Sequence, residues 1–169
     1  MTIQRYVFAL FALLAPLGVF AAQTGMSPEA QAVTERNRQF IAQAFADWAA
    51  GEGSFLDDVL AEDAVWIIKG SGPSAGAYKG RDDFMERAVK PFADRMATFV
   101  QPTVRDIWAD GEHVIVHWDG AGTAADGAPY RNSYVWILRM DDGKAAEVIA
   151  FLDLPKYEDV LRRVPAPKK

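Results

Sequence analysis

The chain contains no cysteine and only two histidines among its 169 residues. The absence of cysteine excludes disulfide bonds, thiolate nucleophiles, cysteine-ligated zinc and a lipoprotein anchor. His113 and His117 lie four residues apart in a predicted strand, a separation of about 13 Å, so they cannot bind one metal ion together. The sequence therefore predicts no metal site and no cofactor.

Long apolar runs are also scarce, and the exception is at the N-terminus. Residues 6–20 are nearly all apolar and follow the single charge of Arg5. They lead into Val19-Phe20-Ala21, which places small residues at the two positions that signal peptidase recognises. This pattern predicts a cleaved secretory signal over residues 1–22 and a secreted or periplasmic protein that leaves the membrane after cleavage. The run is shorter than the roughly 20 residues that a membrane span needs, but a retained anchor stays an alternative.

The rest of the chain has neither an internal repeat nor a low-complexity linker. We expect a single domain over residues 23–164 and a flexible tail over residues 165–169. The net charge is −5, with both signs dispersed along the chain. This distribution argues against a nucleic-acid partner.

Helix signals come first and strand signals later. Ser27 and Pro28 begin a long helix that Gly51 ends, a short helix follows Ser54, and Asp82 lies in the first turn of a third helix that Pro91 bends or ends. The glycine-rich residues 69–80 are predicted to form a loop. Five strands and a closing helical turn are predicted over Ala64–Ile68, Thr98–Trp108, His113–Thr123, Tyr130–Met140, Ala145–Asp153 and Tyr157–Val164. This order indicates an α+β fold in which helices cover one face of an antiparallel sheet.

The last strands carry an unusual row of side chains. Asp126-Gly127 and Asp142-Gly143 favour tight hairpin turns between them. Because side chains alternate along a strand, one face carries Tyr130, Asn132, Tyr134 and Trp136. Apolar rings with hydrogen-bonding tips are typical of ligand cavities, whereas an ordinary hydrophobic sheet face with wet edges is the alternative.

Several segments together resemble a known superfamily. They are the long first helix, Ala61–Trp66, Gly76–Asp82, Tyr130–Tyr134, and Asp142-Gly143-Lys144 through to Asp153. The chain resembles the nuclear transport factor 2-like superfamily, in its SnoaL-like and ketosteroid-isomerase-related branch. The resemblance implies a cystatin-like or SnoaL-like α+β barrel: a strongly curved, cone-shaped, mixed or antiparallel sheet packed on three N-terminal helices, often in a homodimer.

The catalytic residues of ketosteroid isomerases have no counterpart at the matching positions. The carboxylate base falls on Ile68, the oxyanion-stabilising acid on Trp136, and the tyrosine of the first helix near Ala44. Proton transfer by that route therefore lacks its proton carriers.

A second branch of the superfamily, the limonene-epoxide-hydrolase-like proteins, suggests a different pair. Its Arg-x-Asp pair corresponds to His117-Trp118-Asp119, while its last-strand aspartate corresponds to Ala150. The match predicts His117 and Asp119 on the cavity face as candidate catalytic residues, and Asp153 is a secondary candidate. The predicted ligand-binding residues are Trp66, Ile68, Tyr78 at the mouth, Asn132, Tyr134 and Trp136.

Three hypotheses remain open at this point. The first is a cofactor-independent isomerase, cyclase or hydrolase in which His117 and Asp119 act on a small apolar or carbonyl-containing molecule. The second is a carrier that binds such a molecule without chemistry. The third is a homodimeric interaction module that uses the outer face of the sheet, where Ser133, Val135 and Ile137 lie.

Overall fold

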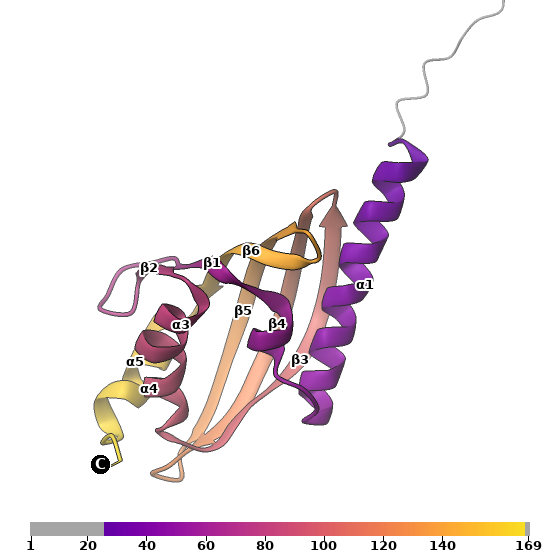
Figure 1. The fold of residues 1–169 in the computed structure, drawn as a ribbon. Helices are drawn as coiled ribbons and strands as arrows, with labels where there is room; N and C mark the ends of the chain where they lie inside the picture. Colours follow the sequence, from indigo (N-terminus) through magenta and orange to yellow (C-terminus); the bar gives the residue numbers. More distant parts are fainter. Residues whose placement is uncertain (1–25, 168–169) are drawn as a thin grey trace, which may run out of the picture.

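The computed structural model describes residues 26–167, and it begins with two helices (Figure 1). Helix α1 spans Pro28–Ala50, with the Ser27 hydroxyl accepting a hydrogen bond from Ala30 N–H at its start and Gly51 in the left-handed conformation at its end. Helix α2 spans Phe55–Val59. Both begin where the capping residues predict. The predicted signal over residues 1–22 lies outside the described residues.

Six strands form one mixed sheet in the order β2-β1-β6-β5-β4-β3. Strand β1 runs parallel to β6, while the other neighbours are antiparallel. Asp142 and Gly143 both have positive φ values, 44° and 77°, which is the geometry expected for a two-residue hairpin loop between β5 and β6. The strands are β1 Leu60–Ile68, β2 Gly76–Lys79, β3 Met96–Asp110, β4 His113–Ala124, β5 Pro129–Asp141 and β6 Lys144–Leu152.

The third helical region is irregular. It comprises α3 Arg81–Phe84, a π-helical turn η1 Met85–Val89, and α4 Lys90–Ala93. The π-helical turn ends two residues before Pro91, whose ring and missing N–H cannot be accommodated in regular helical hydrogen bonding. The expected bend at Pro91 is therefore taken up as a widened turn one residue before α4.

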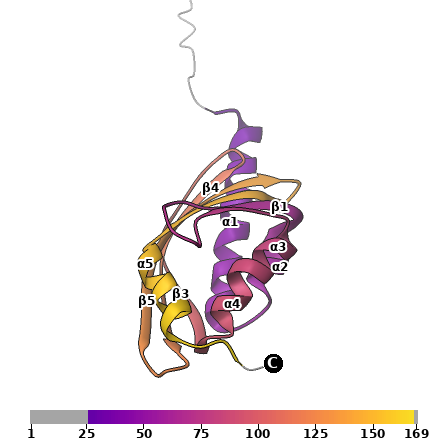
Figure 2. The same cartoon turned by 90° about the vertical axis from the view of Figure 1, so that its left-hand side faces the viewer.

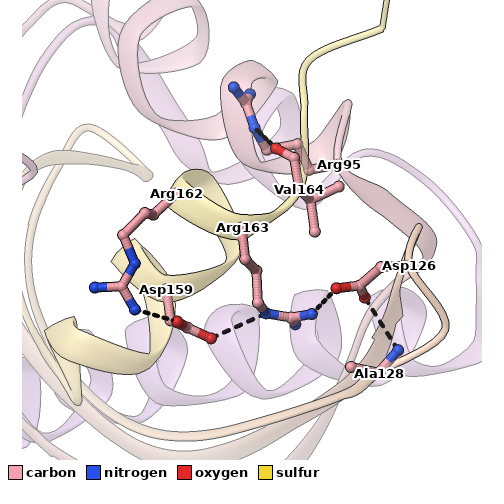
Figure 3. Close-up of polar contacts among 7 residues, drawn as sticks. All are labelled: Arg95, Asp126, Ala128, Asp159, Arg162, Arg163 and Val164. Carbon is pink, nitrogen blue, oxygen red and sulfur yellow. Dashed lines mark hydrogen bonds and ion pairs between the residues drawn. The ribbon is translucent and has the colours of Figure 1, made fainter.

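Helix α5, Leu154–Arg163, closes the described chain and is longer than the predicted helical turn. Its C-terminal end is held by charged side chains (Figure 3). Arg163 pairs with Asp159, at 2.9 Å, and with Asp126 of the hairpin between β4 and β5. Arg95 donates from Nε to the carbonyl oxygen of Val164, at 2.8 Å. These contacts fix α5 against the sheet.

The sheet curls around the helices without closing into a complete barrel (Figure 2). Every second residue of β5 from Tyr130 to Met140 is buried, so one face of this strand belongs to the core. On the opposite face, a row of partly exposed side chains crosses five strands in register. It consists of Ile67, Ile149, Ile137, Ile115 and Trp108.

The predicted α+β class and curved sheet are confirmed, but the sheet is mixed and not purely antiparallel, because β1 runs parallel to β6. Residues 69–80 are not entirely a loop, because Gly76–Lys79 forms the edge strand β2 beside β1. Pairing with β1 stabilises this short strand, which buries only Tyr78. Of the predicted tail, residues 165–167 belong to no helix or strand. Within residues 26–167, no helix combines the length and the apolar character that crossing a bilayer requires.

Candidate functional site

A cavity of about 370 Å³ lies between the inner face of the sheet and the helices. Its exposed wall residues, Gly53, Ser54 and Phe99, mark the mouth. Residues from the helices, the π-helical turn and five strands contribute to its wall. They are Trp48, Gly53, Ser54, Phe55, Leu56, Trp66, Ile68, Phe84, Met85, Ala88, Val89, Phe92, Phe99, Val100, Trp118, Tyr134, Trp136, Ala150, Leu152 and Tyr157.

Aromatic rings are packed against one another throughout this wall. The Trp118 and Tyr134 rings are stacked with centroids 3.9 Å apart, and Trp66 is stacked on Phe84 at 4.2 Å. Trp136 lies edge-on between these two stacks, 4.9 Å from Trp66 and 4.8 Å from Trp118. Such ring packing holds flat apolar surfaces in fixed orientations.

One glycine makes the central stack possible. A Cβ atom on Gly120 would lie 3.0 Å from both Trp118 Cζ3 and Tyr134 Cε2, and 2.6 Å from Val100 Cγ1. The 2.6 Å contact is shorter than real Cβ contacts, and the two 3.0 Å contacts are tighter than most of them. The missing side chain of Gly120 therefore leaves room for both rings.

The wall contains no charged side chain, and its hydroxyl groups are few. The Ser54 hydroxyl donates to Asp57 Oδ2 at 2.6 Å, and the Tyr157 hydroxyl donates to the Ala88 carbonyl at 2.8 Å. The third hydroxyl, on Tyr134, lies 2.7 Å from the Tyr130 hydroxyl. Burial is the main cause that raises the pKa of Tyr134 and of Tyr157, so both phenols keep their protons at neutral pH.

Asn132 anchors the polar groups behind the wall. Its Oδ1 accepts hydrogen bonds from the backbone N–H groups of Ser133 and Asp153, at 2.9 and 3.0 Å. Its Nδ2 donates to the Asp153 carbonyl at 3.0 Å and to the Tyr130 hydroxyl at 2.9 Å. Since a backbone N–H can only donate, these contacts fix which end of the amide carries oxygen. Asn132 therefore links β5 to the start of α5.

The indole nitrogen of Trp118 is the buried side-chain polar atom without a hydrogen-bond partner among the described residues. Trp118 is 2% exposed and its ring is enclosed by aromatic neighbours, including Phe45 and Trp48. An unpaired buried donor typically costs about 1–3 kcal/mol. The aromatic packing is thus maintained at the expense of one hydrogen bond.

Four of the predicted ligand-binding residues line the cavity, namely Trp66, Ile68, Tyr134 and Trp136. Their role in binding stays a prediction. Tyr78 and Asn132 do not lie in the wall. Tyr78 is buried, with its hydroxyl donating to the Ser74 carbonyl at 2.9 Å and its ring edge-on to Phe84.

The predicted placement of His117 and Asp119 on the cavity face is wrong. Both are half-buried on the outer face of β4, whereas their neighbour Trp118 points inward to the cavity wall. Asp119 accepts a hydrogen bond from the Ser133 hydroxyl, at 2.6 Å, and pairs with Arg105 at 2.7 Å. The Ser133 hydroxyl and then Arg105 lower the pKa of Asp119.

A signal for the correct face was present in the sequence. Val114, Val116 and Trp118 share one face of β4 by alternation and are all at most 2% exposed. Following this apolar stripe would have placed His117 outside and identified Trp118 as a wall residue. The match to the Arg-x-Asp pair instead suggested the opposite face.

Asp153 also lies away from the cavity wall. It is exposed at the start of α5, where its carboxylate pairs with Lys156 at 3.1 Å. Its backbone, rather than its side chain, takes part in the Asn132 contacts. Among residues 26–167, no three histidine, aspartate or glutamate side chains come together as metal ligands would.

The curled sheet with an apolar cavity on its helix-covered face defines the class of this protein as a nuclear transport factor 2-like fold. A family model described as SnoaL-like domain matches residues 38–148, which is more than half of the chain. The chain therefore belongs to the SnoaL-like domain family. A search of curated proteins found no match.

Solved structures agree with this fold. Bal32a, from a soil-derived mobile gene cassette, is 16% identical with a TM-score of 0.63, covering 76% of this chain and 98% of its own. An NTF2-like protein from Burkholderia xenovorans is 25% identical, with a TM-score of 0.55 and coverage of 81% and 99%. A protein described as a candidate SnoaL-like polyketide cyclase, from a Jannaschia species, is 17% identical, with a TM-score of 0.60 and coverage of 83% and 99%.

Proposed function

We propose that this SnoaL-like domain binds a small, neutral and largely flat apolar molecule in its cavity. The observation that carries the proposal is the wall itself, in which stacked aromatic rings and aliphatic side chains enclose about 370 Å³ without a charged group. Pockets of this size and composition are typical of small-molecule sites. A charged ligand would lose its hydration there without gaining a counter-ion.

Acid–base catalysis has no part in this proposal. His117 and Asp119 lie on the outer face of the sheet, and the raised pKa values of Tyr134 and Tyr157 keep both phenols protonated, so neither is available to accept a proton. Ile68, Trp136 and Ala150 line the cavity at three positions where the resemblance implies an acidic side chain. These side chains provide apolar surface in place of proton transfer, which favours a carrier over an isomerase.

A direct binding experiment tests the proposal. Calorimetric titration with phenanthrene should give saturable binding, and 9-phenanthrenecarboxylate should bind at least tenfold more weakly because no cation lines the wall. Val89→Phe should fill part of the cavity and weaken the binding of phenanthrene, since Val89 is a half-buried wall residue of the π-helical turn. Glu86→Phe is the matched control, because Glu86 lies on the same turn but is exposed and outside the wall. Equal binding of the two probes, or a Val89→Phe variant that binds like the parent chain, would contradict the proposal.

The predicted export and homodimer belong to the same proposal. The export signal lies outside the described residues, and detection of the mature N-terminus by mass spectrometry after secretion would test it. The outer row of Ile67, Ile149, Ile137, Ile115 and Trp108 offers an apolar surface for a second copy of the chain, since Trp108 is 52% exposed. Light scattering should then give twice the mass of one chain, and the Ile137→Arg variant should have the mass of a single chain. A single-chain mass for the parent protein would rule out the dimer.

A further inference from the structure

We propose that the Tyr134 hydroxyl donates a hydrogen bond to a carbonyl or similar oxygen acceptor of the bound molecule. This inference rests on the proposed binding function and adds a polar feature to the ligand. The ligand would be a flat apolar ring system that carries one acceptor oxygen. The basis is a count of hydrogen-bond donors behind the cavity wall.

The direction of the hydrogen-bond chain starts at Asn132. Because two backbone N–H groups fix its Oδ1, its Nδ2 must donate to the Tyr130 hydroxyl, at 2.9 Å. The Tyr130 oxygen is therefore an acceptor in that contact. A hydroxyl that accepts one hydrogen bond becomes a stronger donor in its next one. Either hydroxyl could donate in the 2.7 Å contact between the two oxygens, and this effect favours donation from Tyr130 to Tyr134.

This direction leaves one proton without an acceptor. Two hydroxyl hydrogens belong to the Tyr130–Tyr134 pair, but only one of them lies in the contact between the two oxygens. With Tyr130 as donor, the remaining hydrogen belongs to Tyr134, which lines the cavity. The reverse direction would leave the hydrogen on Tyr130, which is 3% exposed and lies outside the cavity wall. A ligand can accept the first hydrogen, whereas the second would be orphaned in the core.

The other polar groups of the wall do not compete for this role. The hydroxyls of Ser54 and Tyr157 already donate within the protein, to Asp57 and Ala88. The indole nitrogen of Trp118 is fully buried behind its neighbours and offers no surface to a ligand. Burial also raises the pKa of Tyr134, which keeps the phenol protonated and preserves it as a donor. A ligand oxygen would therefore be oriented toward the Tyr134 end of the cavity.

A matched pair of probes isolates this hydrogen bond. Fluorene and 9-fluorenone share a flat three-ring shape, but only fluorenone carries a carbonyl. The parent protein should bind fluorenone about three- to tenfold more tightly, which is the ratio expected for one net neutral hydrogen bond. Tyr134→Phe should abolish the preference. Tyr78→Phe should keep it as the matched control, because the Tyr78 hydroxyl donates to the Ser74 carbonyl and Tyr78 lies outside the cavity wall. Tyr130→Phe should leave a smaller preference, since Tyr134 then donates without the support of the chain.

Infrared spectroscopy of the bound ligand gives a second, independent readout. The carbonyl stretch of bound fluorenone should move to lower frequency in the parent protein and return in Tyr134→Phe. Equal affinities in the parent protein, an unshifted carbonyl stretch, or a preference that survives in Tyr134→Phe would overturn the inference and leave the proposed apolar binding intact. Failure of both probes to bind would overturn the two proposals together.

Discussion

Replacing Asn132 with leucine should lower the free energy of unfolding by about 2–4 kcal/mol. Asn132 is 4% exposed and makes two hydrogen bonds to the backbone of Asp153, at the start of α5. A leucine of similar size would fill the space but remove the acceptor of the Ser133 and Asp153 N–H groups. The Asp153 carbonyl would keep the backbone N–H groups of Lys156 and Tyr157, at 3.2 and 3.4 Å. Each N–H group that loses its acceptor costs about 1–3 kcal/mol, and some access of water to the exposed Asp153 keeps the sum toward the lower part of the range. Tyr130 would also lose a donor.

Urea unfolding followed by circular dichroism measures this loss. With a slope of about 2 kcal/mol per molar urea, the midpoint should fall by about 1–2 M. Asn37→Leu is the matched control, because Asn37 is 6% exposed but donates only one hydrogen bond to another residue, from Nδ2 to the Gly111 carbonyl. The control should lose about half as much stability or less. Equal losses in the two variants, or an unchanged midpoint for Asn132→Leu, would refute the structural role of the Asn132 contacts.

Three further predictions address other regions. His117→Ala and Asp119→Asn should leave the affinity for phenanthrene unchanged in calorimetric titration, since both residues lie on the outer face. A tenfold loss of affinity in either variant would show that the residue takes part in binding. Gly120→Ala should destabilise the protein by about 1–3 kcal/mol in urea unfolding, because its Cβ would overlap the Trp118–Tyr134 stack and Val100. Arg163 lowers the pKa of Asp126 below its ordinary 3.8, so the stability from this pair is fully present above pH 3.8 and is lost as the pH falls through the lower, folded-state pKa. Asp126→Asn should remove that part of the acid dependence, and an unchanged dependence would show that the pair contributes nothing.

Much of the fold could be predicted because local chemistry determined it. Ser27 and Gly51 mark the ends of α1, and Asp142-Gly143 forms the turn between β5 and β6. The alternation from Tyr130 to Trp136 placed those side chains on the buried face correctly. In each case the deciding interaction lies within a few residues of the chain.

The remaining features depend on contacts between distant segments. Strand β2 exists because Gly76–Lys79 pairs with β1, and its own sequence, with two small residues, has little strand preference. The division of β4 into inner and outer faces was misjudged because the resemblance to Arg-x-Asp outweighed the apolar stripe at Val114, Val116 and Trp118. The contacts of Asn132 with Asp153 join residues 21 positions apart, which no local pattern indicates.

The π-helical turn Met85–Val89 sets the rotational phase between two aromatic stacks. Phe84 lies before the turn and stacks on Trp66, while Phe92 lies after it and stacks on Tyr157, at 4.8 Å. Deleting a single residue in this turn would rotate everything after it by about 100° about the helix axis. Phe92 would then face away from Tyr157, and the cavity would lose the part of its wall that these two rings form. The length of this turn, more than its composition, therefore sets the shape of the space offered to a ligand.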